Sequence, residues 1–130
     1  MRGIGSEHDF FKQYPALLAT SYQGSLISTS EGILEVFEKA RNKSKKLDPN
    51  LYLQLIYFDE MGLAEISPNN PLKVLHSQLE LNNEQQIAFV GISNWGLDAA
   101  KMNRGVYVTI NEPDQEDLTE LAKIISNTFI

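Results

Sequence analysis

The fold is decided by residues 51–60, which read LYLQLIYFDE. The first eight of these residues are apolar at almost every position, apart from Gln54. A run that is apolar on both faces is typical of a central strand in a parallel sheet. Two acids, Asp59 and Glu60, follow it directly. The stretch therefore predicts a buried strand that ends in a pair of carboxylates.

Further strands are predicted on both sides of this one in the sequence. Short, mostly apolar runs occur at residues 16–22, 87–92 and 105–110. Strands that alternate with helices imply a parallel sheet that is covered by helices on both faces. The functional groups of such sheets gather beyond the C-terminal ends of the strands. The places to look are residues 22–25, 59–60 and 93–94.

Helices are predicted where a capping side chain precedes an apolar periodicity. The capping residues are Ser28 (with Glu31 completing a capping box), Asn70 (before Pro71 at the first helical position), Asp98 and Asp114. Residues 61–69, between the second strand and the second of these helices, are expected to form a loop. The third helix is short and ends at about residue 102.

Composition restricts the classes of function. The chain has 130 residues, enough for one domain, and 11 basic against 17 acidic residues argue against general nucleic-acid binding. It has no cysteine, which excludes disulfides, thiolate catalysis and cysteine-ligated metal sites. No apolar run approaches the length of a membrane span. We expect no membrane span and no nucleic-acid partner. The absence of cysteine suits a reducing and an oxidising compartment almost equally, and the location that we expect is the cytoplasm.

The acid pair is of the kind that a nucleotide hydrolase needs at a strand end. The first carboxylate, Asp59, would face a magnesium ion, usually through water, and Glu60 would orient and polarise the attacking water. The alternative is a strand that ends in two solvated acids. Asn94 ends a strand 34 residues after Glu60. Its amide could hold a water or sense a γ-phosphate, although a turn-forming asparagine is the commoner case.

A third candidate is Arg104, which follows the short helix and precedes the last expected strand. An arginine at such an edge can reach a phosphate in a neighbouring unit, as an arginine finger does. The alternative is a surface arginine or a local ion pair with Asp98. These three elements, taken together, narrow the class of protein further.

Their combination resembles the second half of an AAA+ ATPase module. Residues 55–60 resemble a Walker B strand, residues 92–94 resemble sensor 1, and residues 97–104 resemble an arginine-finger helix. Longer strings are similar to the mysterin family, giant E3 ubiquitin ligases with a dynein-like AAA+ core and a RING domain. These strings are SYQGS (21–25), DEMGLAEISP (59–68), PLKVLH (71–76), VGISNW (90–95) and MNRG (102–105). The resemblance covers about residues 16–120.

The resemblance implies a fold with one part missing. AAA+ modules are three-layer α/β P-loop NTPase cores with a parallel sheet in the order 5-1-4-3-2. This sequence contains no P-loop of the pattern G-x-x-x-x-G-K-[ST], the loop that cradles the phosphates. We therefore expect residues 1–130 to be one partial AAA+ domain that supplies strands 2 to 5 without the first strand. The isolated chain is expected to be inactive, and strands 4 and 5 are expected to separate or to expose unpaired edges.

The resemblance also implies roles for the candidate residues. In a complete module with ATP and Mg²⁺, Asp59 would help to hold the metal and Glu60 would activate water. Asn94 would sense the γ-phosphate, and Arg104 would act on the nucleotide of a neighbouring module. The implied parent activity is ATP hydrolysis coupled to conformational change in a ubiquitin ligase. The implied partners are neighbouring AAA+ modules of the same chain and the ubiquitin machinery.

Two alternatives stand beside this interpretation. The first is an AAA+ unit that binds no nucleotide and serves as a scaffold or interaction module, against which the intact acid pair argues. The second is a receiver-like domain with Asp59 as phosphoacceptor and Lys101 as its lysine. A receiver needs an acidic pair after its first strand, and residues 21–23 (SYQ) offer none.

Overall fold

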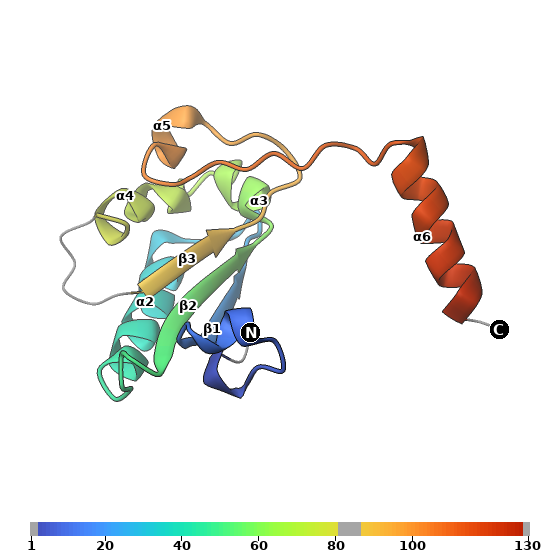
Figure 1. Ribbon diagram of the computed structural model, residues 1–130. Coiled ribbons are helices and arrows are strands. Elements are labelled where there is room, and N and C mark those ends of the chain that lie inside the picture. The colour runs from blue at the N-terminus through green and yellow to red at the C-terminus, as the bar shows by residue number, and fades with distance from the viewer. Residues whose placement is uncertain (1–2, 81–86, 129–130) are drawn as a thin grey trace.

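A computed structural model describes residues 3–80 and 87–128 (Figure 1). Its sheet has three parallel strands in the order β1-β2-β3. The strands are β1 (Ala16–Gln23), β2 (Tyr52–Asp59) and β3 (Ile87–Gly91). The middle position of β2 confirms the prediction from its apolar sequence. Asp59 is paired with Gln23, and Phe58 with Gly91, so the C-terminal ends of all three strands meet at one edge.

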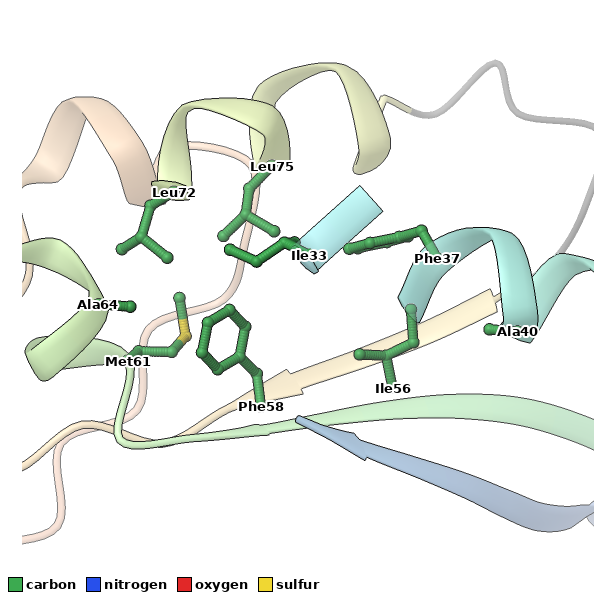
Figure 2. Packing of buried hydrophobic residues seen from close by; sticks show 9 residues of the cluster. All are labelled: Ile33, Phe37, Ala40, Ile56, Phe58, Met61, Ala64, Leu72 and Leu75. Carbon is green, nitrogen blue, oxygen red and sulfur yellow. The ribbon is translucent and has the colours of Figure 1, made fainter. Parts of the chain in front are cut away.

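One face of the sheet carries the core. Helix α2 (Ser30–Ser44) packs across β2 there, and the short helices η2 (Pro71–Val74) and α4 (Leu75–Gln78) close over it. Figure 2 shows the cluster, which consists of Ile33, Phe37, Ala40, Ile56, Phe58, Met61, Ala64, Leu72 and Leu75. The Phe58 ring lies 4.9 Å from that of Tyr22 and 6.3 Å from that of Phe89, edge to face in both cases. Phe58 therefore joins all three strands.

The first turn of α2 differs from the predicted capping box. Thr29 is the N-cap, and its side chain accepts a hydrogen bond of 3.1 Å from the Gly32 amide. The predicted cap, Ser28, is wrong because its hydroxyl is used elsewhere: the Ser25 amide and the Tyr22 hydroxyl donate to it. Hydrogen bonds of the preceding loop thus move the N-cap by one residue, from Ser28 to Thr29.

The sequence predicted a loop at residues 61–69, but only part of this segment is a loop. They begin with a one-turn helix, α3 (Met61–Glu65), which follows the acid pair directly. No side chain caps α3, but Met61 and Ala64 are buried in the core. Packing rather than capping stabilises this turn, and the sequence offered no local signal for it. The helix expected after Asn70 is divided into η2 and α4, and Asn70 makes no side-chain capping bond.

The expected fourth strand does not form. Residues 105–110 belong to no strand, and Val106 and Ile110 are 92% and 91% exposed. A strand needs a hydrogen-bonding neighbour, and in the order implied by the AAA+ resemblance that neighbour is strand 1. Within residues 3–80 and 87–128, nothing pairs with the outer edge of β3. The expected strand 5 is therefore absent, and the outer edge of β3 is unpaired within the described residues, as one of the two expected outcomes had it.

The helices after β3 have their predicted caps. The Asp98 side chain accepts from the Ala100 amide at the start of α5 (Ala99–Met102). The Asp114 side chain accepts from the amides of residues 116 and 117 at the start of α6 (Gln115–Thr128). Figure 1 shows α6 standing away from the sheet at the end of an extended segment. Its described residues are all exposed, so its apolar stripe is not packed.

The sequence predicted helices on both faces of the sheet, but the described helices cover only one face. The face of the sheet opposite α2 carries Leu53, Leu55 and Tyr57 from β2, which are half-buried, and Val90 from β3, which is 45% exposed. Neither long helix lies on it, since α2 is on the other face and α6 stands apart (Figure 1). Residues before β1 form η1 (Gly3–Gly5) and α1 (Asp9–Lys12). In the described part of the chain, no helix is sufficiently long and apolar to cross a membrane.

Removing the Phe58 ring should be the most damaging kind of change to this core. Phe58→Ala leaves a cavity between three strands and α2, so we expect a loss of about 3–5 kcal/mol in the free energy of unfolding. Phe10→Ala is the matched control, because Phe10 is 63% exposed and should cost less than about 1 kcal/mol. Urea denaturation followed by circular dichroism compares the two. Equal losses would contradict the packing described here.

Candidate nucleotide-hydrolysis site

The acid pair lies at the edge where the strands end. Asp59 is the last residue of β2, and Glu60 follows with a φ of 51°, in the left-handed region. A side chain other than glycine costs roughly 1–3 kcal/mol in such a conformation, and strain of this kind gathers at functional sites. The Asp59 carboxylate accepts a 2.9 Å hydrogen bond from the Glu60 amide, which supports the turn. The chain thus turns at Glu60, between the end of β2 and the start of α3.

This turn brings Glu60 to Asn94. The Asn94 side-chain amide donates to both carboxylate oxygens of Glu60, at 3.2 and 3.4 Å. The two residues are 34 positions apart, and the parallel pairing of β2 with β3 brings them together. The inference from the sequence that the two strands are neighbours is therefore confirmed. An amide fixed on a catalytic-type carboxylate can orient it and share a bound water with it.

Several contacts join α3 to the chain that follows β3, and we call this set the α3 seam. The Met61 amide donates to the Ile92 carbonyl at 2.8 Å, and the Asp98 amide donates to Glu65 at the same distance. Between these two bonds, the Trp95 indole lies on Gly62. The seam continues the pairing of β2 and β3 beyond the sheet. The Trp95 side chain thus packs its loop against α3.

On the other side, the end of β1 presses against the acid pair. The Gly24 amide donates to the Asp59 carbonyl at 2.8 Å. A Cβ at Gly24 would lie only 2.3 Å from the Glu60 carbonyl oxygen, so only glycine allows this approach. In the sequence Gly24 reads only as the end of a strand. Its role was missed because the clash is with a residue 36 positions away, for which the sequence has no local signal.

Buried hydroxyls hold the loop that contains Gly24. Ser28 and Ser67 are 4% and 5% exposed, and the Ser67 hydroxyl donates to the Ser28 carbonyl at 3.1 Å. The Asn69 side chain donates to the same carbonyl at 3.2 Å, and the Tyr22 hydroxyl donates to the Ser28 hydroxyl at 3.1 Å. Satisfied buried polar networks of this kind rigidify a structure. The loop that supports the acid pair is therefore fixed at both ends.

Arg104 does not join the other candidates. Its guanidinium forms a 3.0 Å ion pair with Glu80, just after α4, and the two side chains are 38% and 55% exposed. The alternative of an ion pair with Asp98 names the wrong partner, because Asp98 caps α5. Sequence reasoning had no means of finding Glu80, which lies on a different element. The structure thus brings together Asp59, Glu60 and Asn94, and keeps Arg104 apart.

The residues present could supply some, but not all, of the ligands of a magnesium ion. Carboxylate oxygens, as in Asp59 and Glu60, are the hard ligands that Mg²⁺ takes. Among the described residues, no group of three or more acidic or histidine side chains could hold a metal by itself. Mg²⁺ commonly uses one or two carboxylates and takes its other ligands from phosphates and water. The acid pair fits that kind of shared site.

Comparison with known proteins gives matches along most of the chain. A family model described as "RNF213 AAA domain" matches residues 1–117. The chain is 38% identical to human E3 ubiquitin-protein ligase RNF213 over 137 residues, and the match covers 100% of the chain. It is 38% identical to zebrafish (Danio rerio) E3 ubiquitin-protein ligase rnf213-beta and 36% identical to mouse RNF213, each over 98% of the chain. In all three cases the chain spans 3% of the relative's length.

The close approach of Gly24 to the acid pair leads to a prediction. Gly24→Ala forces the Glu60 carbonyl to move, so we expect a loss of about 1–3 kcal/mol and altered amide chemical shifts at residues 59–61. Gly32→Ala is the control, because its Cβ would meet nothing closer than 3.4 Å and alanine favours a helix by about 0.5–1 kcal/mol. Thermal denaturation and two-dimensional NMR measure both variants. Stability changes of the same sign would count against the proposed contact.

Proposed function

The chain belongs to the RNF213 AAA domain family, and on that basis we propose that residues 1–130 supply the Walker B, sensor 1 and arginine-finger segments of an ATP-hydrolysing module. The observation that carries the proposal is the contact between Asn94 and the Glu60 carboxylate, at the edge where three parallel strands end. Ligands of open α/β sheets bind at this edge. The same edge holds Asp59.

Each residue would have a separate task at this edge. Bound Mg-ATP supplies the phosphoanhydride that is cleaved. The Glu60 carboxylate orients and polarises the attacking water, and the Asn94 amide keeps that carboxylate in place and can donate to a γ-phosphate oxygen. The backbone of Asp59 is held by a hydrogen bond from the Gly24 amide. Its carboxylate would provide an oxygen ligand for Mg²⁺. Positioning and charge stabilisation are what phosphoryl transfer requires of a protein.

Arg104 would act on a neighbouring module. Its ion pair with Glu80 is exposed, and such pairs contribute about 0–1 kcal/mol. A phosphate of the neighbouring nucleotide offers a stronger, charge-assisted partner for the same guanidinium. The pair with Glu80 can therefore be exchanged at little cost when a loaded neighbour is present.

The relatives' names set the wider proposal. They are E3 ubiquitin-protein ligases, so we propose that this module serves a ubiquitin ligase in the cytoplasm, with neighbouring AAA+ modules and the ubiquitin machinery as partners. Family membership favours this over the receiver-like alternative with Asp59 and Lys101. The side chain of Lys101 lies outside the described residues. The scaffold alternative is distinguished by the experiments below.

The first experiment uses the 130-residue chain itself. Because its sequence contains no P-loop, it has no amide cradle and no lysine for the phosphates. We expect no saturable binding of Mg-ATP at micromolar concentration and no hydrolysis. Isothermal titration calorimetry with a phosphate-release assay measures both. Binding of Mg-ATP at micromolar concentration would contradict the proposal that these 130 residues lack the phosphate cradle.

The second experiment tests Glu60 in a complete module that also carries the P-loop segment. Glu60→Gln keeps the shape of the side chain but removes the base, so ATP binding should persist while turnover falls by about 10²-fold or more. Glu35→Gln, an exposed change on α2, is the matched control and should leave turnover unaltered. If Glu60→Gln hydrolyses ATP at the wild-type rate, the scaffold alternative replaces the catalytic one.

The third experiment tests Arg104 in the same complete protein. Arg104→Ala should leave the affinity of its own module for ATP unchanged and should slow hydrolysis at the adjacent module by about 10³-fold, the lower value for an arginine finger. Glu80→Gln removes the internal partner but keeps the guanidinium, so hydrolysis should persist. Single-turnover assays with inactivating P-loop changes in one module at a time separate the two sites. Unchanged hydrolysis in both modules would contradict a finger role.

A further inference from the structure

The sequence contains a single tryptophan, and it lies next to the proposed site. Trp95 is 43% exposed, which is unusual for a residue that carries so much apolar area. Part of its indole lies on Gly62, in the first turn of α3. A Cβ built on Gly62 would be 2.5 and 2.6 Å from Cε2 and Cζ2 of the indole. The ring, together with the Ser93 hydroxyl oxygen at 2.8 Å, therefore occupies the space that any other side chain at position 62 would need.

This contact flanks Asn94 on one side, and a backbone hydrogen bond flanks it on the other. The Ile92 carbonyl accepts from the Met61 amide at 2.8 Å. Between the two anchors, the Ser93 hydroxyl donates to the Trp95 carbonyl at 2.7 Å and accepts from the Trp95 amide at 3.3 Å. The backbone on both sides of Asn94 is thus fixed to α3, the helix that Glu60 precedes.

We propose that Trp95 is a positioning residue that holds the Asn94 amide against the Glu60 carboxylate. The hydrogen bond alone is too weak for this task. Both partners are partly exposed, water competes for them, and such a bond contributes about 0.5–1.5 kcal/mol. The apolar contact of the indole with Gly62 needs no partner from solvent, and it fixes the loop from which Asn94 projects.

The inference rests on the proposed function for its catalytic consequence. A carboxylate that orients water is effective only at one position relative to the γ-phosphate. A displacement of about 1 Å can cost 10²-fold in rate. In this scheme Trp95 acts through Asn94 and contacts neither the attacking water nor the nucleotide. Its removal should therefore lower turnover without weakening the binding of ATP.

The contact itself can be tested in the 130-residue chain, independently of catalysis. In Gly62→Ala the added methyl group displaces the indole, so we expect the emission of Trp95 to shift to longer wavelength and its quenching by acrylamide to increase. Gly96→Ala is the matched control at the residue that follows Trp95, because apart from its chain neighbours its Cβ would meet only the Tyr107 hydroxyl, at 3.7 Å. Its spectrum should equal that of the wild type. A wild-type spectrum for Gly62→Ala would overturn the proposal.

The positioning effect is tested by NMR of the Asn94 side-chain amide in the same chain. In Trp95→Leu, these resonances should move to the values found in Glu60→Ala, where the hydrogen bond cannot form. Trp95→Phe keeps a flat ring on Gly62 and should keep wild-type positions. Circular dichroism and the melting temperature show that the variants are folded, as expected for a side chain that is nearly half exposed. Wild-type Asn94 resonances in folded Trp95→Leu would overturn the proposal.

The catalytic consequence is measured in the complete module with its P-loop segment. Trp95→Leu should reduce kcat by about 10²-fold with KM for ATP changed less than twofold, and Trp95→Phe should restore most of kcat. A normal kcat in Trp95→Leu, where Glu60→Gln is inactive, would refute the positioning role. If Glu60→Gln is fully active, the proposed function fails instead, and the fluorescence and NMR results still decide whether Trp95 positions Asn94.

Discussion

Strand β2 is hydrogen-bonded to a parallel neighbour on each edge, and the elements that form the core take their positions from it. Its inward side chains, Gln54, Ile56 and Phe58, are all buried. Helix α2 packs over them because its own apolar face has the matching spacing. Parallel pairing on both edges then requires that the C-terminal ends of the strands lie side by side. A single strand thus determines both the core and the place of the site.

The site is a consequence of what happens one residue beyond that strand. Glu60 takes a left-handed conformation, which is unfavourable for a glutamate, and the surrounding contacts compensate for it. Gly24 supports the backbone from the side of β1, and the α3 seam supports it from the side of β3. Strain that is held from two sides is typical of a group whose direction matters more than its contribution to stability.

The described residues leave large apolar areas without a partner. Val108 in the extended segment is 76% exposed, and Ile124 on α6 is 62% exposed. The outer edge of β3 and the sheet face with Leu55 are likewise not fully covered. In the strand order that the AAA+ resemblance implies, another strand lies against this edge. The arrangement of Asp59, Glu60 and Asn94 forms without that additional strand. It depends only on β1, β2, α3 and the end of β3.

The sequence by itself determined the properties that depend on neighbouring residues. The apolar run of residues 51–58 specified a central strand, and Asp98 and Asp114 specified helix starts, because capping acts over two or three positions. The family motifs predicted that Glu60 and Asn94 act together, and the two side chains are in contact. Only the tertiary structure decided that Gly24 supports the acid pair and that Glu80 holds Arg104, since these contacts join distant positions. It also decided that residues 105–110 form no strand: a β-strand is stabilised by hydrogen bonds to a neighbour, and its own sequence cannot provide that neighbour.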